Sequence, residues 1–276
     1  MSMKLSVFLE HVYEAASQTG QAEDAVLKIV KGFGIDYVEA PLERIFYRED
    51  EVLRLKAAGF GIGNVYAFYD FGHDKDHHAA MPLIETAARL HVKKVEVIPG
   101  FIARGEDAAP MLSNMQHALN ELCEEAVKRG VTVMMENFDG IMAPYATTQG
   151  LAWFMEQVPL LRCCFDTGNF LFSEEDALQA YEVLKSRIVH VHAKDRSLTR
   201  KKGEKPLRTI KRRKLYSSPV GHGCIPIRQI VEDLRRDGYN GIFAIEHFGS
   251  KDMLGYMRAS AEWLRALPVF TRSLSV

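Results

Sequence analysis

The chain has 276 residues, of which 47% are hydrophobic and 10% aromatic, so it can bury a sizeable core. A net charge of -1 argues against a chain built as a whole for nucleic acid or for an anionic membrane. The four cysteines form no CxxC pair, so we expect reduced core thiols. No signal-like segment opens the sequence, so we expect a cytoplasmic protein. No apolar run reaches the ~20 residues of a membrane span, so we expect no membrane partner.

Short apolar runs alternate along the chain with segments whose apolar residues recur at helical spacing. The apolar runs predict strands that begin near residues 5, 37, 62, 92, 132, 162, 188 and 242. The helical segments that follow them lie at residues 22–33, 49–58, 81–90, 110–129, 148–157, 174–186, 226–237 and 252–266. This alternation is typical of a parallel sheet, and eight units within about 250 residues favour a closed (β/α)8 TIM barrel over an open sheet. No linker interrupts the pattern, so we expect a single domain over residues 1–276.

The stretch 187–195 is unusual for a plain core strand. Because strand side chains alternate between two faces, His190 and His192 point the same way, and Lys194 and Asp195 follow at the C-terminal end. In α/β proteins the chemistry gathers at such strand ends. We therefore expect His192 at a functional site and His190, one layer deeper, as a hydrogen-bonded core imidazole.

Three other predicted strands each stop at a single carboxylate, which is Glu136, Asp166 or Glu246. A carboxylate at the end of a buried strand is costly unless it is paired or bound to a cation. Together with a histidine, these groups would satisfy one another around one divalent metal ion. The oxygen-rich set suits manganese, magnesium or cobalt better than structural zinc, and we expect manganese, with the other three ions as alternatives. Glu39 and Glu96 are expected to face the barrel interior, as hydrogen-bonded core groups or as substrate contacts.

The longest gap between predicted elements contains residues 196–214, with ten Lys or Arg against Glu204 as the one acidic residue. This segment begins at the C-terminal end of the seventh strand, the end at which TIM barrels hold their sites. We expect a basic insertion that is either solvated, or serves as a lid, a clamp for an anionic substrate or a subunit contact in a homodimer or homotetramer.

The order of these groups along the strands resembles the xylose isomerase-like TIM-barrel superfamily, the sugar phosphate isomerase/epimerase group that includes ketose 3-epimerases and inosose dehydratases. The resemblance covers essentially the whole barrel and is strongest over residues 130–266. The matching motifs are Glu136-Asn137, Asp166-Thr-Gly-Asn169, His190-Val-His-Ala-Lys-Asp195, Pro219-Val-Gly-His-Gly223 and Ala244-Ile-Glu246.

The resemblance implies that Glu136, Asp166, His192 and Glu246 bind one divalent metal. Such a metal can hold the carbonyl and neighbouring hydroxyl oxygens of a ketose and stabilise the enediolate that forms when a C–H proton leaves. By similarity to the ketose 3-epimerases, Glu136 and Glu246 would act as base and acid on opposite sides of that carbon. The expected function is therefore a metal-dependent isomerase or epimerase of a sugar or sugar phosphate.

Four further residues are expected to contact the substrate. Asn169 stands where the epimerases carry a substrate-contacting histidine, and Lys194 lies near Leu198, where an arginine is usual. Asn137 belongs to the fifth-strand motif, and His11 ends the first strand together with Glu10, from which either could touch a sugar.

Three other functions stay open. A keto-inositol (inosose) dehydratase would use the same enediolate, with Lys194 or a histidine as the acid for the leaving hydroxyl. A non-catalytic sugar-binding barrel would not need two opposed glutamates. The type IV apurinic endonucleases need three zinc ions and carry histidines where this chain has Asn169 and Ile98-Pro99, so a nucleic-acid partner is not expected. The histidines of the stretch 72–78 fit a polar loop and helix start better than a zinc site.

Overall fold

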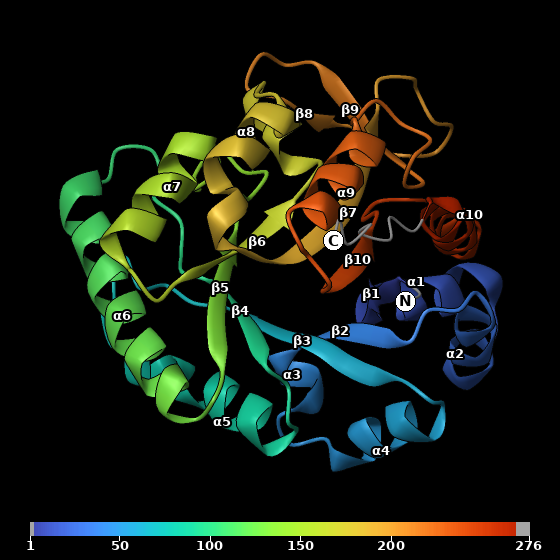
Figure 1. Cartoon of the computed structure of the whole chain (residues 1–276), viewed down its shortest axis with the longest axis horizontal. Helices are drawn as coiled ribbons and strands as arrows, with labels where there is room; N and C mark the ends of the chain where they lie inside the picture. The colour runs from blue at the N-terminus through green and yellow to red at the C-terminus, as the bar shows by residue number, and fades with distance from the viewer. Residues whose placement is uncertain (1–2, 269–276) are drawn as a thin grey trace, which may run out of the picture.

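The structure, a computed structural model, describes residues 3–268. Eight parallel strands form a closed barrel, because β10 is hydrogen-bonded to β1 on one side and to β7 on the other (Figure 1). The barrel strands are β1 (Lys4–Phe8), β2 (Tyr37–Pro41), β3 (Gly61–Phe68), β4 (Lys94–Ile98), β5 (Thr132–Glu136), β6 (Arg162–Asp166), β7 (Ile188–Ser197) and β10 (Ile242–Glu246). The predicted TIM barrel is confirmed. The ends of the predicted single domain, residues 1–2 and 269–276, lie outside the described residues.

Helices surround the barrel on its outer face (Figure 1). They are α1 (Leu9–Thr19), α2 (Glu23–Gly32), α3 (Leu42–Ile45), α4 (Glu49–Ala57), α5 (Met81–Arg89), α6 (Ala108–Lys128), α7 (Thr148–Gln157), α8 (Ala177–Leu184), α9 (Ile227–Arg236) and α10 (Met253–Ala266). Short 3-10 helices occupy η1 (His77–Ala80), η2 (Asn169–Ser173) and η3 (Lys185–Arg187).

Three of these helices differ from the expectation. Helix α1 and the short helix α3 were not predicted, although in α1 Leu9, Val12 and Ala16 recur at helical spacing and are buried on one face. Helix α8 begins later than expected because Asp176 caps it, with Oδ1 accepting the backbone N–H groups of Leu178 and Gln179 at 2.8 and 3.1 Å. These differences leave the order of the barrel units unchanged.

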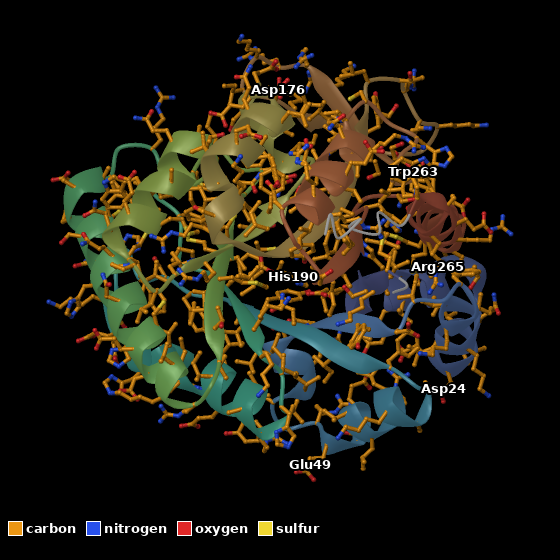
Figure 2. The ribbon with its side chains drawn as sticks, viewed as in Figure 1. Asp24, Glu49, Asp176, His190, Trp263 and Arg265 are labelled. Carbon is orange, nitrogen blue, oxygen red and sulfur yellow. The ribbon has the colours of Figure 1, made fainter. Side chains whose placement is uncertain are left out.

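The core is one continuous cluster of apolar side chains from strands and helices, and a polar layer is enclosed within it. His190, labelled in Figure 2, lies in this layer. Its Nε2 is 3.2 Å from Oε2 of Glu39, and its Nδ1 is 2.8 Å from Nζ of Lys94. Burial lowers the pKa of His190 to about 4, so the ring is neutral and can donate to Glu39 while it accepts from Lys94. The prediction of a hydrogen-bonded core imidazole is confirmed.

The basic insertion is more structured at its ends than expected. Strand β7 continues past Asp195 to Ser197, because its last three residues pair antiparallel with β9 (Lys214–Ser218). A two-residue strand, β8 (Leu207–Arg208), extends this small sheet on the far side of β9. In Figure 1 the β8 and β9 pair projects beyond the barrel. The predicted range 196–214 therefore overlaps strand residues at both ends.

Asp195 organises the loop that follows β9. Its Oδ2 accepts the backbone N–H groups of Gly221 and Gly223 at 2.9 and 2.8 Å, and its Oδ1 accepts those of Arg196 and Ile225 at 2.8 and 3.2 Å. A Cβ at Gly223 would lie 2.2 Å from Oδ1 of Asp195, so the close approach requires glycine there. At Gly221 glycine is required for another reason, because φ is +81° and a Cβ would lie 2.0 Å from the Trp263 ring.

The cysteines agree only in part with the expectation of core thiols. Cys123, Cys163 and Cys164 are free and buried. Cys224 is exposed, because it lies in the loop before α9 rather than in a barrel element. Within residues 3–268, the helices are too short or too polar to cross a membrane.

Candidate active site

Four side chains from adjacent strands converge at the C-terminal end of the barrel. Glu136, Asp166 and Glu246 are the last residues of β5, β6 and β10. His192 lies on β7, where the strand register places it beside Asp166 on one side and Ala244 on the other. One donor atom from each of the four side chains lies within 4.8 Å of all the others. The structure thus brings together the four metal ligands that the sequence suggested.

The geometry of this cluster fits a divalent cation. Nδ1 of His192 is 3.2 Å from Oε2 of Glu136 and 3.3 Å from Oε2 of Glu246. Oδ1 of Asp166 accepts two backbone N–H groups of the following loop, at 2.7 and 2.8 Å. Its Oδ2 is buried and has no hydrogen-bond partner among the described residues, so this oxygen is available as a metal ligand. Three carboxylates and one imidazole are suitable ligands for manganese, magnesium, cobalt or zinc.

Burial and like charge disturb the titration of these groups. Burial, reinforced by two neighbouring glutamates, raises the pKa of Asp166 well above its usual range, and burial also raises the pKa of Glu136. Burial acts in the same direction on Glu246, but Lys194 and His192 outweigh it and hold the pKa of Glu246 well below its usual range. Burial alone would lower the pKa of His192, yet Cys164, Glu96 and Glu136 together raise it well above its usual value. A bound divalent cation would relieve the repulsion within this set.

Lys194 lies at the edge of the cluster and faces the cavity. Its Nζ is 2.5 Å from Oε1 of Glu246, and 3.5 and 3.6 Å from the Oδ2 atoms of Asp166 and Asp139. Burial would lower the pKa of Lys194, but these three carboxylates raise it above its usual value, so the ammonium stays charged. This predicted substrate residue is therefore placed where it can reach a ligand.

Asn137 and Asn169 lie behind the cluster and are not among the residues that line the cavity. The amide of Asn137 pairs with the backbone of Asp166, donating to its carbonyl oxygen and accepting from its N–H, both at 3.1 Å. The Nδ2 of Asn169 donates to the carbonyl oxygen of Asn137 at 2.8 Å. These bonds tie the ends of β5 and β6 together and position Asp166. Contact of the two asparagines with substrate stays a prediction.

His11 is fully buried near the start of α1. Its Nε2 accepts the backbone N–H of His247 at 3.0 Å, and the two rings lie 4.5 Å apart. His11 does not line the cavity, whereas the preceding residue, Glu10, does. Contact of His11 with substrate likewise stays a prediction.

A cavity of about 600 Å³ opens at this end of the barrel, within the size range of small-molecule sites. Glu136, His192, Lys194 and Glu246 line one part of it. Aromatic side chains form much of the remaining wall, namely Phe8, Tyr66, Phe68, Phe138 and Phe248. The other charged lining residues are Glu10, Glu96, Asp139, Arg196 and Lys205. The site therefore combines the strand-end charged cluster with a wall in which aromatic and charged side chains both take part.

Sequence reasoning missed the aromatic wall and Asp139. Phe138 and Phe248 each follow a strand-end glutamate by two residues, so their closeness to the predicted ligands was a usable signal. Tyr66 lies within β3 and carried no such signal. The cavity is also lined by Lys205 and Leu207, which confirms that part of the basic insertion lies at the barrel mouth.

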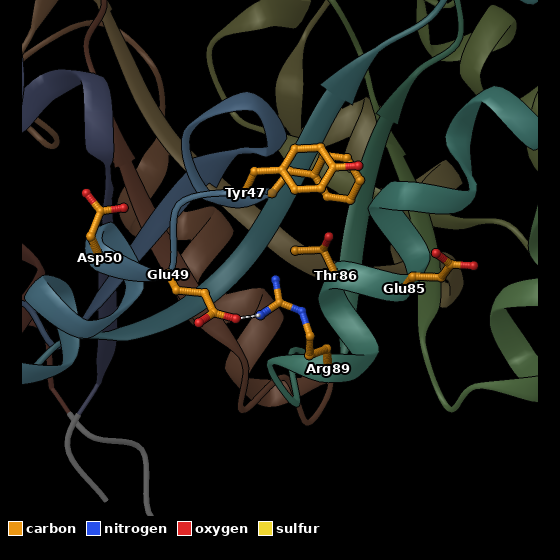
Figure 3. Close-up of a pocket in the computed structure, with 7 residues that line it drawn as sticks. Tyr47, Glu49, Asp50, Glu85, Thr86 and Arg89 are labelled. Carbon is orange, nitrogen blue, oxygen red and sulfur yellow. Dashed lines mark ion pairs between the residues drawn. The ribbon is translucent and has the colours of Figure 1, made fainter.

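Two other places have a feature of a binding site, one a hollow and the other a cluster of donor atoms. A hollow of about 650 Å³ lies outside the barrel near α4 and α5, where Arg89 faces Glu49 at 3.9 Å and the Tyr47 ring is 84% exposed (Figure 3). Its lining includes no strand-end carboxylate and no histidine. Donor atoms of Asp76, His77 and His78 lie within 4.8 Å of one another at the solvent-facing start of η1, where Asp76 caps the helix. This confirms the expected polar loop and helix start.

Comparison with known proteins gives relatives of two activities. The chain is 29% identical to the inosose dehydratase of Geobacillus thermodenitrificans over 134 residues, which are 46% of this chain and 44% of that protein, so the match spans less than half of the relative. It is 21% identical to the L-ribulose-5-phosphate 3-epimerase UlaE of Salmonella paratyphi A over 279 residues, with 92% of this chain and 93% of that one covered.

Solved structures show the same fold. A xylose isomerase-like TIM barrel protein from Mycobacterium smegmatis, in complex with magnesium, has a TM-score of 0.68 at 18% identity, over 88% of this chain and 87% of that chain. At this identity the likeness concerns the fold alone. The family model described as xylose isomerase-like TIM barrel matches residues 27–267, which is most of the sequence. The chain therefore belongs to the xylose isomerase-like TIM barrel family.

Proposed function

We propose that the protein is a divalent-metal-dependent sugar isomerase or epimerase that moves a proton next to a carbonyl group. The observation that carries this proposal is the convergence of Glu136, Asp166, His192 and Glu246 at the cavity, with donor atoms within 4.8 Å of one another. These four residues would hold the ion, for which manganese is our expectation. When bound, the ion supplies a Lewis acid that polarises a carbonyl and favours negative charge on its oxygen. The epimerase relative and the magnesium complex of the Mycobacterium smegmatis protein support this reading.

The residues of the chain would perform the proton transfers. Glu136 and Glu246 come from β5 and β10, with β6 and β7 between them, so their carboxylates approach the cavity from separate strands. One carboxylate can take a proton from the substrate carbon and the other can return one. Return to the opposite face of the same carbon gives an epimer, and return to the neighbouring carbon gives an isomer. Lys194 orients Glu246 through its 2.5 Å contact with Oε1.

A keto-inositol (inosose) dehydratase is a second candidate. The observation that favours it is the charged Lys194 ammonium in the cavity beside Glu246. In this reaction a glutamate would remove the proton next to the carbonyl, and Lys194 would protonate the hydroxyl that leaves as water. The resemblance of part of the chain to an inosose dehydratase is in keeping with this alternative.

Deuterium uptake tests these candidates directly. The protein is stripped of metal, reloaded with manganese and incubated in heavy water with D-fructose, D-tagatose, L-ribulose, their phosphates and a keto-inositol. We expect NMR to show deuterium next to the carbonyl together with a new epimer or isomer. An unsaturated ketone formed with loss of water would favour the dehydratase, and binding without exchange would favour a non-catalytic sugar-binding barrel.

Metal removal is the control for the same assay. We expect chelation to abolish exchange while circular dichroism shows an intact barrel, because the ligands lie at the mouth and the apolar core lies beneath them. Exchange that persists in protein shown by elemental analysis to be metal-free would contradict the proposed role of the cluster.

A further inference from the structure

The cavity has a second polar centre, built from α1 and β3 rather than from β5, β6, β7 and β10. Glu10, the second residue of α1, and Tyr66 of β3 both line the cavity. The Tyr66 hydroxyl donates a short hydrogen bond to Oε1 of Glu10. The other carboxylate oxygen, Oε2, is buried and has no hydrogen-bond partner among the described residues.

An acceptor left in this state is costly. A buried polar group without a partner destabilises the fold, and does so more when it is charged. The only hydroxyl proton of Tyr66 is already used on Oε1, so Tyr66 fixes the carboxylate without satisfying its second oxygen. Glu10 lines the cavity, so a small rotation of its carboxylate would present the buried Oε2 to a ligand there, which can supply the missing donor.

One aromatic ring connects this centre to the four strand-end residues. The Phe8 ring lies 5.6 Å from the Tyr66 ring and 5.1 Å from the His192 ring, with edge contacts to both. Phe8 itself lines the cavity. The cluster at His192 and the pair at Glu10 are therefore two ends of one cavity wall, and a small ligand can touch both.

We propose that Glu10, positioned by Tyr66, forms a second subsite that accepts a hydrogen bond from a substrate hydroxyl remote from the reacting carbon. This inference rests on the proposed function, since it assumes a polyhydroxylated substrate whose carbonyl end lies at the four strand-end residues. An ionised carboxylate only accepts hydrogen bonds, so the group it binds must be a donor.

The charges around the cavity also set the direction in which a substrate lies. Glu10 and Glu96 place acidic groups on the side of α1 and β4 and disfavour an anion there. Lys205, from the insertion, places a cation elsewhere on the wall, whereas Arg196 of β7 is already paired with Asp139 there. A substrate with both a hydroxyl tail and an anionic group would therefore direct the hydroxyl to Glu10 and the anion toward Lys205.

The structural alternative is that Glu10 only supports the first turn of α1, where an acidic side chain is favoured by the helix dipole. This alternative predicts lost stability on substitution but no change in substrate choice. Glu14 offers a matched control, because it lies on the same helix and does not line the cavity.

The experiment compares Glu10→Gln, Tyr66→Phe and Glu14→Gln in metal-loaded protein. On a ketose that the wild type turns over, we expect Glu10→Gln to raise KM about 10- to 100-fold, the range for a hydrogen bond to a charged group, with kcat nearly unchanged. Tyr66→Phe should raise KM less, and Glu14→Gln should match the wild type. With the deoxy analogue that lacks the bound hydroxyl, the wild type and Glu10→Gln should have equal KM values.

Three results would overturn the inference. One is an unchanged KM in Glu10→Gln with thermal melts showing a folded protein. Another is an equal penalty with every deoxy ketose in the series, which would mark a structural role. If an amino sugar binds more tightly than the sugar with a hydroxyl at the same position, the preferred ligand group is an ammonium, and the stated ligand class is refuted.

Failure of the proposed function is distinguishable from failure of the subsite. Wild-type protein that exchanges no proton on any ketose contradicts the proposed function alone. The subsite is then measured by saturation-transfer NMR with myo-inositol as the probe and magnesium as the ion. A weaker signal for Glu10→Gln than for Glu14→Gln supports the subsite, and equal signals refute it.

Discussion

Glu246→Gln separates the electrostatic role of this residue from its proposed chemical role. Oε1 of Glu246 contacts the Lys194 ammonium at 2.5 Å, and Oε2 lies 3.3 Å from Nδ1 of His192. Glutamine keeps the size of the side chain and an oxygen for a metal, but it loses the negative charge and cannot accept the substrate proton. We expect turnover to fall at least about 100-fold, the low end for general acid–base catalysis.

The stability change follows from the buried ammonium. Removal of one partner of a buried ion pair costs about 3–5 kcal/mol. Asp166 and Asp139 remain 3.5 and 3.6 Å from Nζ of Lys194, so we expect the lower end of that range. For a chain of this size, about 3 kcal/mol corresponds to a fall in Tm of roughly 6–12 °C. Adding Lys194→Met removes the unpaired charge, so the double variant should regain most of the stability and none of the activity.

Thermal melts and urea unfolding of chelated protein measure the loss of stability, because bound metal would otherwise replace the lysine as counter-charge. Deuterium uptake with reloaded protein measures the loss of turnover. A single variant as stable as the wild type, or a double variant no more stable than the single one, would refute the pairing argument. Turnover close to that of the wild type would rule out Glu246 as base or acid.

Two further variants test the barrel interior and the insertion. His190→Ala leaves the buried Glu39 and the half-buried Lys94 without their shared neutral partner, so we expect a loss of about 1.5–3 kcal/mol in urea unfolding, the range for a hydrogen bond to a charged group, and a loss below about 1 kcal/mol would contradict the buried network. Lys205→Ala should raise KM for a phosphorylated ketose several-fold more than for the neutral one, with a weaker salt dependence, whereas Arg213→Ala, outside the cavity, should not. If the two alanine variants behave alike and light scattering shows an unchanged mass, the insertion neither binds phosphate nor joins subunits.

The barrel was predictable because its signals are local and repeated. The apolar runs that end at Glu136, Asp166 and Glu246 report burial and strand ends at once, and parallel strands bring such ends to the same side. Helix α1 was missed because its apolar positions directly continue those of β1, so the change from strand to helical spacing after Phe8 is short and ambiguous.

The rest of the site depends on contacts between residues far apart in the sequence. Tyr66 and Glu10 are 56 residues apart in the sequence. They meet because β3 and β1, from whose end α1 begins, belong to the same closed barrel. His11 looked like a site residue from its position, but one step along α1 turns its ring away from the cavity and toward His247. Side-chain direction at a strand-to-helix junction follows from the packing of the helix, which no motif encodes.

The clamp at Asp195 has a consequence for how this barrel can change over time. It fixes the loop after β9 by three backbone hydrogen bonds, and the pairing of β7 with β9 fixes the chain on both sides of residues 198–213. The intervening segment therefore begins and ends at anchored points, and doubling a loop's length costs only about 0.6 kcal/mol in closure entropy. New sequences could be exchanged between these anchors without disturbing the strand-end carboxylates. A barrel arranged in this way can acquire a different substrate wall while the chemistry beneath it is inherited unchanged.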